Sequence, residues 1–493
     1  MSLAAYIAMA GVALGGALAA LGFPLEGGAT AVLGFSLVYV RMDRTLTPAL
    51  LFGPSSYAYL WHALGYSIGP LAQRYILGEE RFFEEGMIRA QWGAVLGLAT
   101  YAFVYPKVFR AVVCRMGNGK GKGRNEPPAG HKWDGYSVLL LAVSVLILFY
   151  DYVKSSGGRF SGSVADVSSL TVTIISSFWY AQIIVFLFLG FLAVKRRGWW
   201  IALAATAYVA YAVFQTLEGS RGPLVTSLLM LATGAVLAGY SRKKAFLALG
   251  LSAFLFIPLA GIVDYYRSTT RYSTYEEGFL GRISAFSEAI QGLRTVEAEG
   301  SQIANRAFIY AISAITVDRV MVMTPDVIPY AGFSGLDAIL YIYVPSIIYP
   351  DRPEISDGNI IAGVYGMGEG TKSVFYYTPA VGEGYRRFGW VGIPLLYGLS
   401  GIIFGAAIAI CWTRRQKREW AAMLAFFLLE GPNIWAFTFN YMAYFILFYV
   451  PKYYVYFAVL GKLQDVAASF HKTILRPRLV RCSAAPSLQR GSS

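Results

Sequence analysis

Long apolar stretches recur along almost the whole chain, and they constrain its fold more than any other feature. A helix of about 20 apolar residues crosses a hydrocarbon core of about 30 Å. Only 14% of the residues are charged, against about 25% in ordinary soluble domains. The sequence therefore predicts an all-α polytopic membrane protein with about twelve transmembrane helices. The apolar stretches are 3–21, 26–40, 46–66, 91–113, 136–152, 168–193, 199–217, 222–240, 245–264, 389–412, 420–436 and 439–460.

Most basic residues lie in alternate breaks between these stretches. The basic breaks are Arg41–Arg44, Lys107–Lys132, Lys195–Arg197, Arg242–Lys244, Arg414–Arg418 and the tail after Lys452. Cytoplasmic loops of membrane proteins are enriched in Lys and Arg, and each basic break follows an even-numbered stretch. One orientation fits them all, with both termini in the cytoplasm. The net charge of +14 then reflects topology and contact with anionic membrane lipids, and nucleic acid is not an expected partner.

The longest break, residues 265–388, is predicted to be a folded subdomain on the outer face. Connections longer than about 15 residues are usually functional or disordered. This one carries an apolar helical repeat over 279–293, and further apolar helices are expected at 303–323 and 334–344. We expect four parts: helices one to nine over 1–264, the large outer loop over 265–388, helices ten to twelve over 389–460, and a basic cytoplasmic tail over 461–493.

A short charged turn, YPDRPEISDGN, interrupts the large loop at 349–359. Pro350 and Pro353 restrict the backbone around Asp351 and Arg352, because a residue before proline is held in an extended conformation. The turn is consistent with a local ion pair between Asp351 and Arg352 that stabilises the loop. It is equally consistent with a catalytic role for these two side chains. The residues alone leave both interpretations open.

Arginines also occur in two other outer breaks. Arg221 lies in the short link between the seventh and eighth helices. Arg267 and Arg271 follow the ninth helix and are four residues apart, so they share a face if that helix continues. The plain structural explanations are an ordinary turn for Arg221 and contact with lipid headgroups for the other two.

A further charged segment precedes the tenth helix and contains Glu383, Tyr385, Arg386 and Arg387. Arginines near the end of a membrane helix usually anchor it. On the outer face the positive-inside rule works against that role. Arg386 and Arg387 therefore need an anionic partner, which is either Glu383 or a phosphate.

These charged residues are suited to binding phosphate and to accepting a proton. Arginine forks bind phosphate bidentately, and a carboxylate in a poorly solvated cleft can have a raised pKa that suits it to accept a proton from a sugar hydroxyl. The outer breaks contain none of the three histidines and show no metal-ligand spacing. The three cysteines are scattered. We therefore expect no metal, no cofactor and no redox chemistry.

The order of these motifs resembles a known family. Ser220-Arg221-Gly222 in a short outer link, a large outer loop, Pro-Asp-Arg-Pro at 350–353, and the glycine-rich segment 382–392 with Glu383, Tyr385 and Phe388 occur in this sequence. The ordered set is similar to that of the bacterial O-antigen polymerases, also called oligosaccharide repeat-unit polymerases. The resemblance covers about residues 215–412. Arg352 stands where the family more often has lysine.

The resemblance implies a membrane glycosyltransferase with a GT-C-like bundle in the bacterial inner membrane. Such an enzyme transfers a growing glycan from undecaprenyl diphosphate onto the next lipid-linked oligosaccharide, so that one lipid-linked substrate is donor and another is acceptor. In this interpretation Glu383, Arg352 and Asp351 are catalytic, and Arg221, Arg267, Arg271, Tyr385, Arg386 and Arg387 bind diphosphate or glycan. A chain-length regulator is a further candidate partner. The related O-antigen ligases rely on an outer-loop histidine that this chain lacks.

A transporter or flippase for lipid-linked oligosaccharide is the alternative prediction, because it also fits twelve helices and arginines that hold diphosphate. Transporters commonly show internal repeats with broken helices at corresponding positions. The sequence shows no such pairing, and its charged residues gather at one predicted mouth of the bundle. The sequence therefore favours the polymerase.

Overall fold

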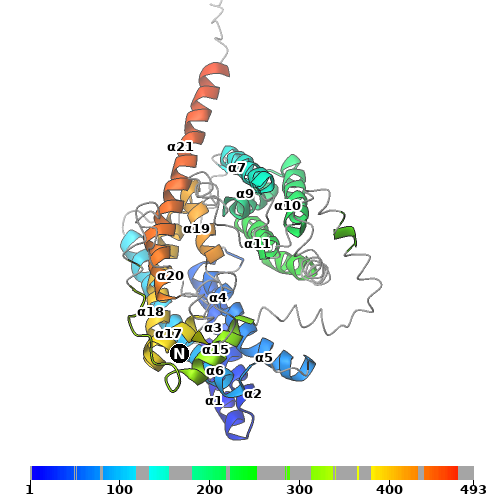
Figure 1. Cartoon of the computed structure of the whole chain (residues 1–493). Helices are drawn as coiled ribbons and strands as arrows, with labels where there is room; N and C mark the ends of the chain where they lie inside the picture. Colours follow the sequence, from blue (N-terminus) through cyan, green and yellow to red (C-terminus); the bar gives the residue numbers. More distant parts are fainter. Residues whose placement is uncertain are drawn as a thin grey trace, which may run out of the picture.

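The computed structural model describes most of the helical part of the chain. The described residues are 3–48, 50–51, 53–77, 82–117, 133–154, 180–217, 222–252, 284, 286–288, 312–336, 339, 364–365, 379–430 and 438–475. Within these ranges the chain is helical apart from short turns and contains no strand. The prediction of an all-helical protein is confirmed for this part (Figure 1).

The described helices lie in one order along the chain. They are α1 (Leu3–Ala20), α2 (Pro24–Gly34), α3 (Ser36–Leu46), α4 (Pro54–Ala63), α5 (Gly69–Ala72), α6 (Glu84–Gly117), α7 (Trp133–Lys154), α9 (Ala181–Lys195), α10 (Trp199–Leu217), α11 (Gly222–Leu237), α15 (Ile312–Met323), α17 (Ala380–Phe388), α18 (Gly392–Arg414), α19 (Arg418–Glu430), α20 (Phe439–Tyr444) and α21 (Val450–Leu475). Single π-helical turns flank α5 at Leu64–Ile68 and Gln73–Leu77, and another, Phe445–Tyr449, joins α20 to α21. A 3₁₀ turn, Gly389–Val391, joins α17 to α18.

Several of these helices are long and apolar enough to cross a membrane. Among the described residues there are five, namely Leu3–Ala20, Glu84–Met116, Trp199–Leu217, Ala380–Arg414 and Phe439–Val466. Three shorter apolar helices accompany them, at Trp133–Ile147, Ala181–Lys195 and Pro223–Leu237. The helices therefore support a membrane-embedded protein, while the count of twelve spans and the GT-C-like arrangement remain predictions.

The N-terminal stretches differ in detail from the prediction. The expected second helix, 26–40, is divided into α2 and α3 at Phe35, and α4 begins only at Pro54. Proline is favoured in the first turn of a helix. The side chain of Asp43 on α3 accepts hydrogen bonds from the amides of Ser55 (3.4 Å) and Ser56 (2.5 Å). This carboxylate therefore caps α4 from a neighbouring helix.

Helix α9 lies at the centre of one group of helices, packed against α7, α10, α11 and α19. Every residue from Ala181 to Leu192 is buried. A helix that is apolar on all sides is expected in such a position. Gly190 and Gly234 let α9 and α11 approach closely, since a Cβ at Gly190 would lie 2.0 Å from the carbonyl oxygen of Leu231.

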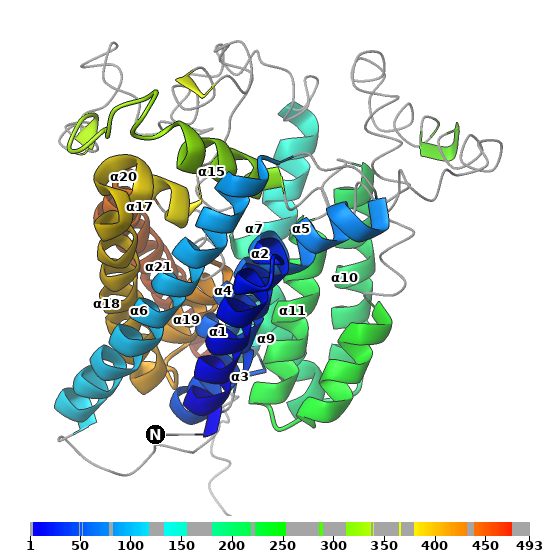
Figure 2. The same ribbon diagram turned by 90° about the horizontal axis from the view of Figure 1, so that it is seen from below.

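Helices α6 and α18 pack side by side, and they define two ends of the structure (Figure 2). At one end, α15 lies across the start of α6 and contacts α17. At the other end, Thr413 of α18 donates a hydrogen bond to the sulfur of Met116 (3.6 Å). Charged residues at this second end are paired between helices, through Arg196 with Asp134 (2.9 Å) and Arg418 with Asp465 (2.6 Å).

The predicted basic breaks gather at this second end. Burial, and then the neighbouring Arg44, lower the pKa of Arg242, so two of the breaks lie together. Arg418, the first residue of α19, lies over the ring of Tyr136 at the start of α7 (5.8 Å). The basic breaks at the ends of α3, α6, α9, α11 and α18 are thus brought to the end opposite α15 and α17.

Candidate functional site

The candidate site is built around α17, a nine-residue helix whose charged side chains point into the protein. Its N-terminus is set by Pro379, whose backbone is extended (φ −54°, ψ 156°). Residues Ala380 to Arg387 are all buried. A short helix with a buried Glu and two buried Arg is unusual, because charged residues are almost never fully buried unless they are paired.

Glu383, Arg386 and Arg387 form a buried ion-pair triad. Arg386 donates to Oε2 of Glu383 through Nε (3.1 Å) and Nη2 (2.8 Å), and Arg387 donates to Oε1 through Nε (2.5 Å). The side chains of Glu383 and Arg387 are 0% exposed, and that of Arg386 is 10% exposed. One carboxylate is thus shared by two guanidinium groups.

Arg387 also ties α17 to the segment 331–335. Its Nη1 donates to the carbonyl oxygens of Gly332 (3.0 Å) and Ser334 (2.7 Å). In return, the amides of Ala331 and Gly332 donate to the carbonyls of Arg386 (2.9 Å) and Arg387 (3.1 Å). The guanidinium group of Arg387 is thus held by Glu383 at Nε and by two carbonyls at Nη1. A lysine could not reproduce this arrangement.

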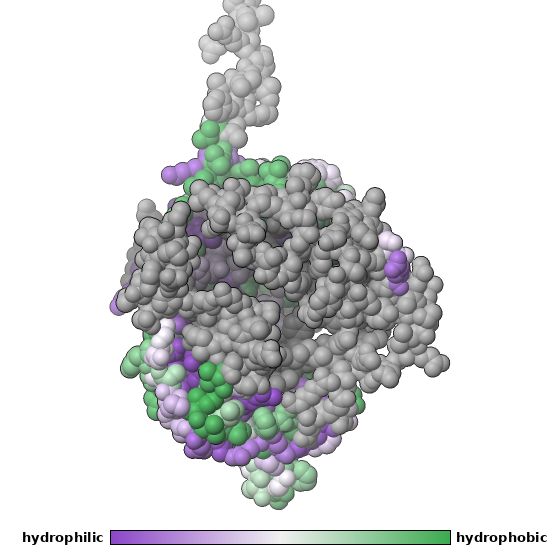
Figure 3. Space-filling model, viewed as in Figure 1, coloured by the Kyte–Doolittle hydropathy of each residue, from purple (hydrophilic) through white to green (hydrophobic). Residues whose placement is uncertain are grey.

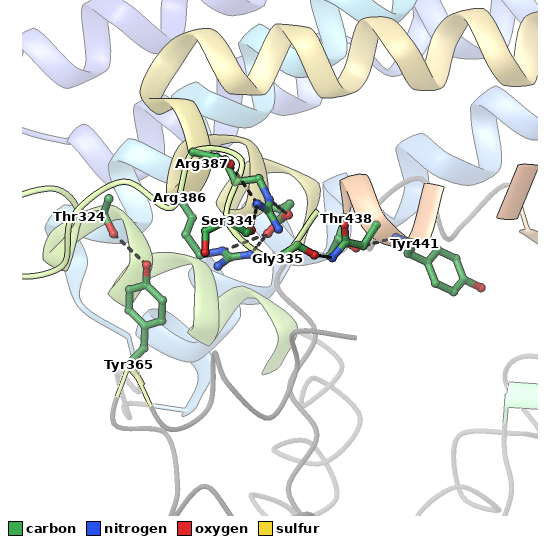
Figure 4. A network of polar contacts seen from close by, with 11 residues as sticks. Thr324, Ser334, Gly335, Tyr365, Arg386, Arg387, Thr438 and Tyr441 are labelled. Carbon is green, nitrogen blue, oxygen red and sulfur yellow. Dashed lines mark hydrogen bonds and ion pairs between the residues drawn. The ribbon is translucent and has the colours of Figure 1, made fainter. Parts of the chain in front are cut away.

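The same network continues to α20 (Figure 4). Asn440 is fully buried and donates from Nδ2 to the carbonyl of Gly335 (2.8 Å). The hydroxyl of Thr438 caps α20 by accepting from the amide of Tyr441 (3.0 Å), and the ring of Phe439 packs edge-on against Phe388 (5.8 Å). The start of α20 is therefore held against α17.

On its other side, α17 adjoins α15 and the start of α6. Asp318 of α15 is 1% exposed and accepts from the amides of Phe83 (2.6 Å) and Arg319 (2.6 Å). Burial raises the pKa of Asp318 to about 7. Gly86 allows this contact, since a Cβ there would lie 2.1 Å from the carbonyl oxygen of Asp318.

Tyr365 extends the polar network toward α15. Its hydroxyl is 2.9 Å from that of Thr324, and its carbonyl accepts from Nη1 of Arg319 (3.2 Å). Figure 4 shows Tyr365 and Thr324 beside Arg386. In the view of Figure 3, hydrophilic residues lie among apolar ones on the described surface around this end of the molecule.

Glycines set the close packing of α17 on α18. A Cβ at Gly384 would lie 2.7 Å from the carbonyl carbon and oxygen of Gly392. Gly389 has a φ of 61°, which glycine adopts without steric cost, and it turns the chain from α17 toward α18. These glycines belong to the motif 382–392.

Four of the nine predicted site residues fall in the described part of the chain. The structure brings Glu383, Arg386 and Arg387 together, and it places Tyr385 in an aromatic cluster. Tyr385 is 4% exposed and packs edge-on against Trp390 (5.5 Å) and Tyr330 (6.2 Å). The other five predicted residues lie outside the described residues: Arg221, Arg267, Arg271, Asp351 and Arg352.

The structure also draws attention to residues that the sequence interpretation missed. Asp318 lies in a stretch predicted only as an apolar helix. Glu430 is 1% exposed at the end of α19, where the hydroxyl of Tyr180 donates to Oε1. For Glu430, the sequence did contain a signal, because this carboxylate lies inside the predicted membrane stretch 420–436. An ionisable residue at such a position is a candidate functional residue. Among the described residues, no group of three His, Cys, Asp or Glu side chains is arranged to hold a metal.

Comparison with known proteins gives one match. A family model described as a domain of unknown function, DUF8712, matches residues 136–411, more than half of the 493 residues. The chain belongs to this family. The matched region begins in α7 and ends in α18, so it contains the whole of α17 and its triad. No curated protein and no solved structure matches the chain.

Proposed function

We propose that this chain is a membrane glycosyltransferase of the inner membrane that polymerises oligosaccharide repeat units. It would transfer a growing glycan from undecaprenyl diphosphate onto a second lipid-linked oligosaccharide at the outer face. The observation that carries the proposal is the Glu383–Arg386–Arg387 triad. It fixes two buried arginines and a buried glutamate at one end of a membrane-embedded bundle.

The position of the triad supports an outer-face site. Basic residues mark the cytoplasmic side of membrane proteins, and most basic breaks of this chain lie at the end of α6 and α18 that is far from α17. The end that carries α15 and α17 would then face outward. The predicted arginines of the outer breaks would suit a diphosphate that arrives from the outer leaflet, because guanidinium groups bind phosphate bidentately.

The main requirement of this reaction is stabilisation of the negative charge that develops on the leaving diphosphate. A hydroxyl oxygen of the acceptor forms a bond to the anomeric carbon of the donor, while the bond from that carbon to the diphosphate oxygen breaks. The negative charge that develops on the diphosphate would be stabilised by the predicted set of Arg221, Arg267, Arg271 and Arg352. Fixed positive groups in a water-poor site are well suited to this role.

We infer different roles for the two predicted carboxylates, Glu383 and Asp351. Both oxygens of Glu383 accept from guanidinium groups, and its side chain is 0% exposed. We therefore infer that Glu383 positions Arg386 and Arg387 and does not take the acceptor proton. Asp351, next to Arg352 in the charged turn, is then the candidate proton acceptor.

Complementation of a strain that lacks this chain tests the proposal. Arg352→Ala and Arg221→Ala should each lower polymer formation by about 100-fold, equivalent to about 3 kcal/mol in the barrier. Arg196→Ala is the matched control, because Arg196 is 35% exposed at the opposite end and should leave polymer formation unchanged. Membrane insertion is checked by quantifying each protein in the membrane fraction. Full-length polymer from both site variants would overturn the assignment.

One observation favours the alternative, a transporter of lipid-linked oligosaccharide. Three polar atoms on α6 are buried, namely Oε1 of Gln91 and the hydroxyls of Tyr101 and Tyr105, and both hydroxyls lie near the side chain of Ser55. Polar groups inside a membrane often mark a pathway for substrate or ions. Net movement of labelled lipid-linked oligosaccharide across a vesicle membrane, without any lengthening of the glycan, would favour the transporter.

A further inference from the structure

Two arginines lie together at the end of the structure that carries the basic breaks. Arg44, in the last turn of α3, interacts electrostatically with Arg242, the first residue of the helix 242–252. Within the described ranges no acidic side chain pairs with either arginine. The carboxylate next to Arg44 in sequence, Asp43, accepts from the amides of Ser55 and Ser56 instead. Two like charges at close range repel each other, and an anion between them would remove that cost.

A partly open cavity lies between α4, α11 and α19, in the direction of the membrane from this pair. Its empty volume is about 320 Å³, including the space at its mouth. Two leucines of α19 form one wall, and α11 contributes Thr226, Leu229, Met230 and Thr233. The hydroxyls of the two threonines donate to carbonyls of their own segment, at 3.2 Å and 2.7 Å. The walls on α11 and α19 are therefore suited to a hydrocarbon chain.

Tyr57 of α4 places a hydrogen-bond donor in the same cavity. It directly follows Ser56, whose amide donates to Asp43, so it lies close to the end of α3. The residue is 9% exposed, and in the part of the chain that the structure describes its hydroxyl has no hydrogen-bond partner. Hydroxyls that are buried to this extent are normally hydrogen-bonded. The cavity therefore offers a donor to an acceptor atom of a ligand.

A small apolar cluster connects the cavity with the arginine pair. Ala232 and Val236 of this cluster flank Thr233 of the cavity on α11, and Ala245 follows Arg242 by one helical turn. At about 1.5 Å per residue, the cavity residues of α11 lie about 6–16 Å from the end of that helix. One leaflet of a bilayer is about 15 Å deep. The cavity thus lies at the depth of the lipid chains of the leaflet on this side.

We propose that these elements bind one anionic phospholipid from the leaflet at this end. The phosphate pairs with Arg44 and Arg242, the hydroxyl of Tyr57 donates to an ester carbonyl, and one acyl chain lies in the cavity. Guanidinium groups bind phosphate bidentately, and basic pockets between membrane helices bind anionic lipid headgroups. The site is at the opposite end from α17, so the inference does not depend on the proposed glycan chemistry.

Lipid titrations followed by native mass spectrometry of the full chain in detergent test the site. The probes are phosphatidylglycerol, phosphatidylcholine with the same acyl chains, and inorganic phosphate. The wild type should bind one phosphatidylglycerol at least about tenfold more tightly than either other probe. Phosphatidylcholine carries a cation beside its phosphate, and inorganic phosphate has no chain to place in the cavity.

Four variants divide the site into its parts. Arg44→Ala and Arg242→Ala should each weaken phosphatidylglycerol binding by about tenfold or more, as expected when a charge-assisted hydrogen bond is lost. Tyr57→Phe removes only the hydroxyl and should weaken binding about threefold. Leu229→Trp fills the cavity and should weaken binding of phosphatidylglycerol at least about tenfold.

Arg110→Ala is the matched control, because Arg110 is an exposed arginine near the same end on α6. It should bind phosphatidylglycerol like the wild type. The melting temperature of each variant in lipid-free detergent confirms that it is folded.

Three results would overturn the inference. Wild-type phosphatidylglycerol binding by both arginine variants, or equal weakening in Arg110→Ala, would reduce the pair to general attraction between a basic surface and anionic lipid. Unchanged binding in a folded Leu229→Trp protein would place the acyl chain outside the cavity. Inorganic phosphate that binds as tightly as phosphatidylglycerol would make the pair an anion site in which the lipid has no part.

Discussion

Replacing Glu383 by Gln removes the one negative charge that lies between two buried guanidinium groups. Three charge-assisted hydrogen bonds reach Glu383 from Arg386 and Arg387. A glutamine keeps the shape and one acceptor oxygen, but its amide group turns a donor toward a guanidinium donor. Breaking a buried ion pair by removing one partner costs about 3–5 kcal/mol. Water does little to reduce this cost, because Glu383 and Arg387 are 0% exposed.

Glu383→Gln should therefore lower the free energy of unfolding by about 3–5 kcal/mol, measured by titration with a denaturing detergent in mixed micelles. Glu85→Gln is the matched control. Glu85 pairs with Arg89 four residues away on α6, but its side chain is 68% exposed, so the loss should be below about 0.5 kcal/mol. The reasoning would be refuted if the two variants unfolded at the same detergent concentration.

Further predictions concern packing, capping and pH. Gly384→Ala should lower the melting temperature, because its Cβ would lie 2.7 Å from Gly392, whereas Gly398→Ala, with its nearest neighbour 3.7 Å away, should melt like the wild type in scanning fluorimetry. Asp43→Ala should destabilise by about 1 kcal/mol through loss of the α4 cap, and Asp43→Asn by much less. Burial raises the pKa of Asp318 to about 7 from 3.8, so the folded chain keeps a proton that the unfolded chain releases. The contribution of this group to stability is present below about pH 4 and is lost as the pH rises toward 7. Asp318→Asn should remove this part of the pH dependence of the melting temperature.

The helical fold was predictable because apolar length alone constrains a membrane helix. The stretch predicted at 199–217 coincides with α10, and 389–412 lies close to α18. The N-terminal stretches were less predictable. The start of α4 depends on a cap that Asp43 supplies from another helix, which a pattern of apolar residues does not contain.

The charged core of α17 was predictable in part. Two arginines in a break that should lack basic residues implied an anionic partner, and the structure gives Glu383 as a partner of both. Spacings of three and four residues on a helix allow that contact. The carbonyls of Gly332 and Ser334 that fix Arg387 come from a segment more than 50 residues away, so no local pattern indicates them.

Residues that depend on tertiary contacts escaped the sequence interpretation. The carboxylate of Asp318 accepts a hydrogen bond from the amide of Phe83, and that of Glu430 accepts one from the hydroxyl of Tyr180. Each partner is more than 200 residues away in the chain. No spacing rule connects such pairs. Arg221, Arg267, Arg271, Asp351 and Arg352 remain predictions of function that rest on the sequence.

We propose that the chain lengthens a lipid-linked glycan. Purified protein in detergent, supplied only with radiolabelled undecaprenyl diphosphate-linked repeat units, tests it most directly. The account predicts a ladder of longer lipid-linked glycans together with release of undecaprenyl diphosphate, and loss of that ladder in Arg352→Ala. Repeat units that remain single with the wild-type protein, while the same preparation moves them across a vesicle membrane, would contradict the account.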